Sequence, residues 1–200
     1  MMFTGIVQEI GSVSKKIETS SGITLEVKTT PKFLENLTVG ASIAVNGVCL
    51  TVTNFSKDNI SFDVIPETLR VTNLKFISEG SKVNLERSLK FGDEVGGHIL
   101  SGHVSCTGIS NLVYAEEEVE LIIECPTEWI KYIFHKGYVA VNGASLTVAK
   151  VTDNSFSVFL IPETLNATNL SKVSDKDLLN IEIDQTTYAA VKALESREKV

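Results

Sequence analysis

The sequence predicts a mainly β protein in which two homologous six-stranded Greek-key β-barrels follow one another in tandem and a C-terminal α-helix ends the chain. Three observations lead to this prediction. One block of sequence occurs twice at a constant offset. Each copy consists of short β-type runs separated by turn residues. The last residues follow the spacing of a helix instead.

The repeat is the strongest of these observations. Residues 46–52 (NGVCLTV) return as residues 142–148 (NGASLTV), an offset of 96 positions, and residues 65–69 (IPETL) return unchanged at the same offset. Counted from Asn46 to Leu74, 14 of 29 positions are identical without a gap. Because chance does not produce such a register, the two halves are homologous.

The starts of the two copies also match, although their offset differs. Residues 4–7 (TGIV) correspond to residues 101–104 (SGHV) at an offset of 97, so one insertion lies between the start and the middle of the repeat. A period near 96 is too long for a solenoid, and each copy should be a small domain. We expect one barrel in residues 1–97, a second in residues 98–186 and a helical tail in residues 187–200.

Within each half, the pattern is that of strands. Residues 23–28 (ITLEVK) alternate apolar and polar side chains, as a half-buried strand does. Residues 42–45, 48–55 and 60–65 are further β-rich runs, separated by Asn-Gly and Asp-Asn turn signals. About six strands per half favour a small closed or Greek-key barrel. An open sandwich is the alternative that spacing alone leaves open.

Helical segments are few. Pro31, after a capping Thr30, predicts a short helix whose counterpart is residues 127–135. From Gln185 to Lys199, apolar side chains recur at spacings of three and four, which predicts an amphipathic helix. That helix either packs on its own chain or joins subunits.

Composition excludes several classes of function. The net charge of −7 and the lack of a Lys/Arg cluster argue against nucleic-acid binding. No apolar run approaches the ~20 residues of a membrane span, and the N-terminus lacks the pattern of a signal peptide. Cys49, Cys106 and Cys125 are widely spaced and form no CxxC pair, so we expect neither a metal site nor a disulfide framework. We therefore expect a cytoplasmic protein whose cysteines are reduced thiols.

These motifs, in their order and doubling, resemble the riboflavin synthase family over nearly the whole chain. The resemblance rests on Phe3-Thr4-Gly5-Ile6-Val7, Asn46-Gly47, Cys49-Leu50-Thr51-Val52, Glu67-Thr68-Leu69, Asn84-Leu85-Glu86-Arg87, Gly96-Gly97-His98, Ser101-Gly102-His103, Ser145-Leu146-Thr147-Val148 and Ile161-Pro162-Glu163-Thr164.

The resemblance implies an activity and an assembly. Two molecules of 6,7-dimethyl-8-ribityllumazine would be converted into riboflavin and 5-amino-6-(D-ribitylamino)uracil by transfer of a four-carbon unit. No cofactor or metal is expected, because one ring gains the carbons that the other loses. The resemblance also implies a homotrimer joined through the C-terminal helices, with the active site between the N-terminal barrel of one subunit and the C-terminal barrel of its neighbour.

Two related pockets would hold two identical substrates face to face, which lowers the barrier by placing them in register. We expect each pocket to be assembled from matched segments of one half. The first set is Gly5, Ile6, Val7, Cys49, Leu50, Thr51, Asp63, Val64, Ile65, Pro66, Glu67 and Thr68. The second set is Gly102, His103, Val104, Ser145, Leu146, Thr147, Ile161, Pro162, Glu163, Thr164, Leu165 and Asn166, with Lys136 as an added contact.

Glu67 and Glu163 offer carboxylates to ribityl hydroxyls. They also suit the N-terminus of a helix that begins at Pro66 or Pro162, and one carboxylate can serve both purposes.

Differences between the halves should carry the asymmetry of the reaction. His103 aligns with Ile6, so one start segment alone has an imidazole, and His103 is our candidate base for the acidic 7-methyl group of a lumazine. Cys49, its counterpart Ser145 or a water molecule would add to the ring carbon bearing that methyl. Thr147 and Ser42 would move protons or stabilise the adduct. Cys49 has an alternative interpretation as a small buried hydrophobe, and His98 and His135 have weaker claims.

Two rivals remain. A non-catalytic lumazine- or flavin-binding protein of the same fold would usually have a degraded second pocket, whereas here the second half keeps Ser101-Gly102-His103 and Ser145-Leu146-Thr147. A flavin-dependent reductase would carry an attached dinucleotide-binding domain, and the sequence has no GxGxxG. The sequence leaves open which pocket holds the donor and which group adds to the ring.

Overall fold

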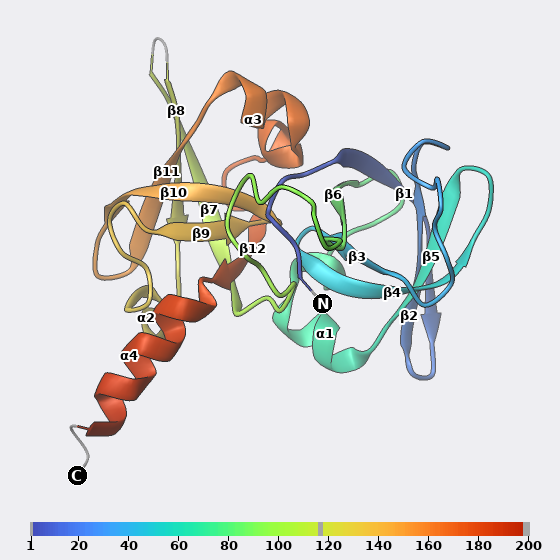
Figure 1. The fold of residues 1–200 in the computed structure, drawn as a ribbon. Helices are drawn as coiled ribbons and strands as arrows, with labels where there is room; N and C mark the ends of the chain where they lie inside the picture. Colours follow the sequence, from blue (N-terminus) through green and yellow to red (C-terminus); the bar gives the residue numbers. More distant parts are fainter. Residues whose placement is uncertain (1, 116–117, 198–200) are drawn as a thin grey trace.

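The computed structural model describes residues 2–115 and 118–197 and consists of two closed antiparallel β-barrels, one per repeat, followed by a helix (Figure 1). The predicted fold class is confirmed. The first barrel comprises β1 (Glu9–Thr19), β2 (Gly22–Lys28), β3 (Ser42–Val45), β4 (Val48–Phe55), β5 (Asn59–Val64) and β6 (Lys82–Arg87). The second comprises β7 (Cys106–Ala115), β8 (Glu118–Glu124), β9 (Tyr138–Val141), β10 (Ala144–Val151), β11 (Ser155–Leu160) and β12 (Leu178–Ile183).

Both barrels have the same non-sequential strand order. The first closes as β1-β2-β5-β4-β3-β6, and the second gives the same circle with six added to each strand number. In both, a helix and a 3₁₀ turn lead from the fifth strand to the sixth. These are α1 (Pro66–Val71) with η1 (Asn73–Lys75), and α3 (Pro162–Ala167) with η2 (Asn169–Lys172). The repeat therefore preserves topology as well as sequence.

Each barrel encloses its own hydrophobic core, which explains the alternation read in the sequence. Along β2, Ile23, Leu25 and Val27 point inward and are buried, whereas the residues between them are partly exposed. The open sandwich is thereby excluded, because both sheets close on themselves.

The prediction of a short helix at Pro31 is wrong. The segment forms successive turns instead, in which Phe33, Leu34 and Glu35 each donate to the carbonyl three residues earlier. Asn36 then adopts a left-handed φ of 56°, which ends any helical path. In the second half, α2 spans only Thr127–Ile130, so the predicted helix over residues 127–135 ends after four residues. In α2 the Ile130 nitrogen donates to the carbonyl of Pro126 four residues earlier, but the following bonds from Tyr132 and Ile133 span three residues, so the α-helix does not continue.

The two barrels contact each other through matched residues of the repeat, and these contacts are reciprocal. Gly47 and Gly143 touch backbone to backbone: a Cβ on Gly47 would lie 2.7 Å from the nitrogen of Gly143. The side chain of Asn84 donates to the carbonyl of Asn142 at 2.9 Å, and Asn180 donates to that of Asn46 at the same distance. These matched asparagines therefore hold the two barrels together.

Helix α4 (Gln185–Arg197) extends away from the second barrel (Figure 1). Tyr188 and Val191 pack on the core of that barrel, and the Tyr188 ring lies 4.9 Å from that of Tyr132. Leu194 is 61% exposed. The helix thus packs on its own chain at its start and leaves apolar surface uncovered further on; residues 198–200 of the predicted tail lie outside the described residues. Among the described residues, no helix is long and apolar enough to cross a membrane.

Candidate active site

The start segment of each half crosses to the barrel of the other half. The backbone nitrogen of Cys49 on β4 donates to the carbonyl of Gly102 at 2.9 Å, and that of Ser145 on β10 donates to the carbonyl of Gly5 at 2.8 Å. Core packing agrees, since Val104 packs against the first barrel and Val7 against the second. The crossing is therefore reciprocal.

Glycine is required at both crossing points. Gly5 and Gly102 have φ values of 74° and 75°, a region that L side chains rarely adopt. A Cβ on Gly102 would lie 2.6 Å from that of Cys49, and a Cβ on Gly5 would lie 2.6 Å from that of Ser145. Any side chain here would push the start segment away from its strand.

This geometry corrects the expected grouping of the pockets. The segment 102–104 joins the first barrel at Cys49, and Val104 packs against the core that includes Val64; we call segments 102–104, 49–51 and 63–68 the Cys49 site. The segment 5–7 joins the second barrel at Ser145, and Val7 packs against the same core as Leu165; we call segments 5–7, 145–147 and 161–166 the Ser145 site. The repeat shows which segments correspond, but not whether each stays with its own half.

Two buried carboxylates hold the crossing segments. Glu182 on β12 accepts hydrogen bonds from the nitrogen and the hydroxyl of Ser101, both at 2.7 Å, and from the nitrogen of Gly102 at 3.0 Å. Glu86 on β6 does the same for Thr4 at 2.6 and 2.8 Å and for Gly5 at 3.1 Å. Burial raises the pKa of both carboxyls, and these hydrogen bonds oppose that rise.

In the Cys49 site, burial raises the pKa of the Cys49 thiol, and a hydrogen bond with Ser42 on the adjacent strand β3 opposes it. Ser42 thus lies next to Cys49, and its role in moving protons or stabilising the adduct stays a prediction. His103 lies beside the site with its side chain exposed, and its backbone nitrogen donates to the Ser101 hydroxyl at 3.2 Å. The site therefore combines the Cys49 thiol with the Ser42 hydroxyl, whereas the exposed His103 lines a hollow with Trp129, Gln185 and Tyr188 of the second half.

The rim of the Cys49 site carries two carboxylates. Asp63 on β5 is exposed and accepts a hydrogen bond from the Thr24 hydroxyl at 2.9 Å. Glu67 lies in the first turn of α1 and forms an ion pair with Arg70 at 2.6 Å; hydrogen bonding to this guanidinium lowers the pKa of Glu67. Glu67 is therefore both a helix N-terminal charge and an exposed acceptor.

The Ser145 site includes His98, for which the sequence supported only a weaker claim. His98 is 8% exposed, and its Nδ1 lies 2.7 Å from the Ser145 hydroxyl. Its ring stacks on Tyr138 at 5.3 Å, and its Nε2 is buried without a hydrogen-bond partner among the described residues. Burial lowers the pKa of His98, against an opposing effect of Asp184. The Ser145 site thus contains an imidazole that does not come from a start segment.

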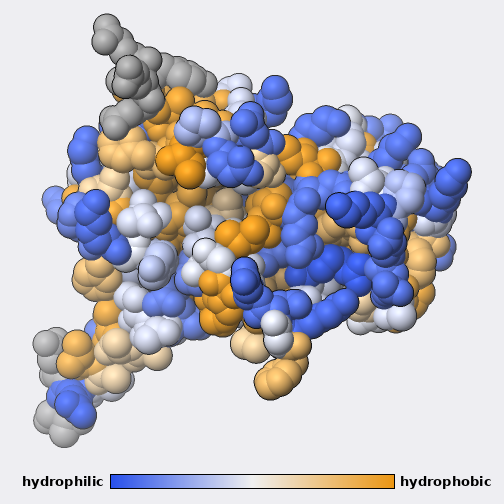
Figure 2. Space-filling model, turned by 45° about the horizontal axis from the view of Figure 1, so that its top comes forward, coloured by the Kyte–Doolittle hydropathy of each residue, from blue (hydrophilic) through white to orange (hydrophobic). Residues whose placement is uncertain are grey.

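The remaining predicted residues divide by exposure. Three of them, Leu50, Val64 and Leu146, are buried in the barrel cores and shape the sites only from beneath. Those with exposed side chains are Ile6, Thr51, Ile65, Pro66, Thr147, Ile161, Pro162, Glu163 and Asn166; Thr68, Thr164 and Leu165 are half-buried. Figure 2 shows hydrophobic surface in the middle of one face, where the two barrels meet.

Two basic residues lie in the turn before β9 and contact β10, the strand of Ser145 and Thr147: the Lys136 nitrogen donates to the carbonyl of Val148 at 2.9 Å. Lys136 is exposed at a left-handed φ of 63°, in the turn before β9. His135 precedes it, and its Nδ1 lies 2.7 Å from the carbonyl oxygen of Ala149. His135 follows a turn and does not end a helix, because α2 stops at Ile130.

Comparison with known families agrees with this architecture. The model of the lumazine binding domain matches twice, over residues 4–88 and 101–184. The chain is therefore built from two lumazine-binding domains, and each match spans one barrel with its start segment.

Relatives identify the family more narrowly. The chain is 43% identical over 202 residues to a riboflavin synthase from Buchnera aphidicola subsp. Baizongia pistaciae (strain Bp), covering 100% of this chain and 95% of the other. It is 42% identical over 196 residues to the riboflavin synthase of Escherichia coli (strain K12), covering 97% and 92%. The chain belongs to the riboflavin synthase family.

A solved structure shares the fold. The crystal structure of LumP complexed with riboflavin matches with a TM-score of 0.84 and 26% identity, covering 92% of this chain and all of that chain.

Proposed function

We propose that this protein is a riboflavin synthase that converts two molecules of 6,7-dimethyl-8-ribityllumazine into riboflavin and 5-amino-6-(D-ribitylamino)uracil. The observation that supports the proposal most is full-length identity near 40% to riboflavin synthases, joined to two lumazine-binding domains that are both intact in their motifs. Because one ring gains the four carbons that the other loses, the reaction balances without an external redox partner.

The two sites are assigned one lumazine each. Backbone groups of the crossing segments and the hydroxyls of Thr51 and Thr147 hydrogen-bond the pteridine edge. Glu67, Glu163 and Asp63 lie on the exposed rim, where they accept hydrogen bonds from ribityl hydroxyls. The unlike pairs Cys49–Ser42 and Ser145–His98 give the two lumazines different chemical surroundings.

His103 is assigned the role of base that removes a proton from the 7-methyl group of one lumazine. Cys49, Ser145 or a water molecule adds to the ring carbon that carries this methyl. The raised pKa of Cys49 keeps its thiol protonated near neutral pH, so the addition at that site needs a proton acceptor. Ser42 is hydrogen-bonded to the thiol and relays that proton, passing its own hydroxyl proton to a ring nitrogen of the lumazine as it accepts the proton from sulfur, and Thr147 has the corresponding role at the other site.

The competing function is a lumazine- or flavin-binding protein without catalysis; LumP, which shares the fold, has been crystallised in complex with riboflavin. Incubation of the purified protein with the lumazine alone, in the presence of a chelator, separates the two. The enzyme produces one riboflavin for every two lumazines consumed, followed by riboflavin fluorescence. Tight binding of lumazine without any riboflavin would identify the non-catalytic protein, and dependence on a metal or nicotinamide would contradict the proposed chemistry.

We further propose a homotrimer in the cytoplasm, with the active centre between subunits. The exposed part of α4 around Leu194 supports assembly through this helix. Deletion of residues 187–200 should give smaller species that bind lumazine weakly and turn over poorly, and residues 1–92 alone should bind ligand without forming riboflavin at low concentration. Sedimentation with the fluorescence assay tests both. A fully active monomer from the deletion would place the active centre within one chain.

A further inference from the structure

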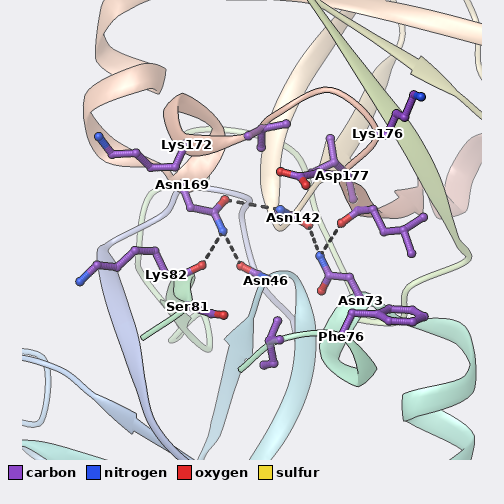
Figure 3. A pocket seen from close by; sticks show the side chains of 14 residues that line it. Asn46, Asn73, Phe76, Ser81, Lys82, Asn142, Asn169, Lys172, Lys176 and Asp177 are labelled. Carbon is purple, nitrogen blue, oxygen red and sulfur yellow. Dashed lines mark hydrogen bonds between the residues drawn. The ribbon is translucent and has the colours of Figure 1, made fainter. Parts of the chain in front are cut away.

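A pocket of about 520 Å³, lined by both polar and apolar side chains, opens where the two barrels meet (Figure 3). Both halves line it, through Asn46, Asn73 and Lys82 on one side and Asn142, Asn169 and Lys172 on the other. None of the residues assigned to the Cys49 site or the Ser145 site contributes to its wall. The pocket is therefore a separate feature of the molecule.

The amide walls are nearly symmetric, with one difference. The side-chain nitrogen of Asn73 donates to Asn142 at 3.0 Å, and that of Asn169 donates to Asn46 at 3.0 Å. The Asn169 oxygen also accepts a bond from Asn142 at 3.4 Å. The Asn73 oxygen has no donor among the described residues, although the residue is 6% exposed. A buried carbonyl oxygen without a donor is costly, so this wall favours a ligand that carries a hydroxyl or N–H group.

The rim of the pocket is cationic in a chain whose net charge is −7. Lys82, Lys172 and Lys176 line it and are exposed, and none of the ion pairs found among the described residues includes them. Figure 3 shows Lys82 and Lys172 on one side and Lys176 on the other. The acidic group of the rim, Asp177, accepts a hydrogen bond from the backbone of Ser174 at 2.8 Å.

We propose that this interbarrel pocket binds a small phosphorylated polyol. The phosphate would lie among Lys82, Lys172 and Lys176, since lysines act as mobile point charges for a dianion. A hydroxyl would donate to the oxygen of Asn73, and the other amides offer further polar contacts. The volume suits a small organic ligand. Because lumazine carries no phosphate, the proposed ligand differs in class from the substrate of the enzyme.

Isothermal titration of the full-length protein with D-ribose 5-phosphate at low ionic strength tests the proposal, with D-ribose and inorganic phosphate as comparison ligands. We expect saturable binding of one sugar phosphate per chain. The triple variant K82Q/K172Q/K176Q should bind at least tenfold more weakly. The matched variant K15Q/K57Q/K90Q removes the same charge from exposed lysines that do not line the pocket and should bind as the wild type does.

A second readout locates the ligand. The side-chain amide NMR signals of Asn73 and Asn169 should shift on titration, and riboflavin formation by both triple variants should stay at the wild-type rate. The proposal is overturned if no saturable binding occurs, if both variants lose affinity equally, or if ribose or phosphate alone binds as tightly as the sugar phosphate. If the wild-type protein forms no riboflavin, the proposed enzymatic function is contradicted, but the proposal for this pocket is unaffected.

Discussion

Glu182→Gln tests whether the buried carboxylate positions His103. The amide oxygen of glutamine can keep the two bonds from Ser101, at 2.7 Å each, but its NH₂ group then faces the backbone N–H of Gly102, now 3.0 Å from a carboxylate oxygen. One charge-assisted bond is lost and a buried donor is left unsatisfied, which costs about 1.5–3 kcal/mol of stability. Because Gly102 directly precedes His103, we expect kcat to fall by roughly 10–100-fold, less than the roughly 10²–10⁴-fold expected for loss of the base itself.

The matched control is Glu86→Gln, because Glu86 makes the same three bonds to Thr4 and Gly5. Glu86→Gln should lose a similar free energy of unfolding in urea. The segment that Glu86 holds carries Ile6 and no candidate base, so KM should rise more than kcat falls. Exchange of the 7-methyl protons of bound lumazine with D₂O, followed by NMR, isolates the proton-transfer step. Wild-type kcat and wild-type exchange in folded Glu182→Gln, despite the expected loss of stability, would refute the positioning role.

Three further predictions concern other parts of the molecule. His103→Gln should slow riboflavin formation about 10²–10⁴-fold and far more than Ile6→Ala, and a loss below fivefold with folding intact would remove His103 from the mechanism. Because burial lowers the pKa of His98, the unfolded chain takes up a proton near pH 6.5 before the folded protein does; stability should be full above that pH and fall as the pH drops toward the folded-state pKa. His98→Asn should lack this fall in urea unfolding at about pH 7.5 and pH 5.5, and parallel profiles would contradict the argument. Gly47→Ala should cost about 1–3 kcal/mol more than Gly40→Ala, since both have positive φ but only Gly47 has backbone within 3 Å of the added Cβ; equal urea midpoints would show that the junction yields easily.

Much of the fold follows from the repeat and the strand pattern. Alternation along residues 23–28 places the buried face of β2 correctly, and the matched turns at Asn46 and Asn142 mark equivalent hairpins. The helix at Pro31 fails because local propensity does not reveal the left-handed Asn36 that ends it. Short helical turns depend on tertiary packing rather than on their own sequence.

The composition of the sites was harder to predict. The sequence of an internal repeat is the same whether each start segment contacts its own barrel or the other one. The repeat therefore shows that Gly5 corresponds to Gly102, but it does not show which strand each glycine contacts. His98 had only a weaker claim from the sequence, because its contact with Ser145, which lies 47 residues away, becomes visible only in the fold. Glu86 and Glu182 correspond to each other at the repeat offset of 96. Only their hydrogen bonds in the structure show that they hold the crossing segments.

The crossing of the start segments is the central claim, and a crystal structure with a non-reacting lumazine analogue tests it most directly. The account predicts that the analogue beside Cys49 and Thr51 contacts Gly102 and His103 of the same chain, while a second analogue beside Ser145 contacts Gly5. An analogue held by Cys49 together with Gly5 of its own chain would contradict the account.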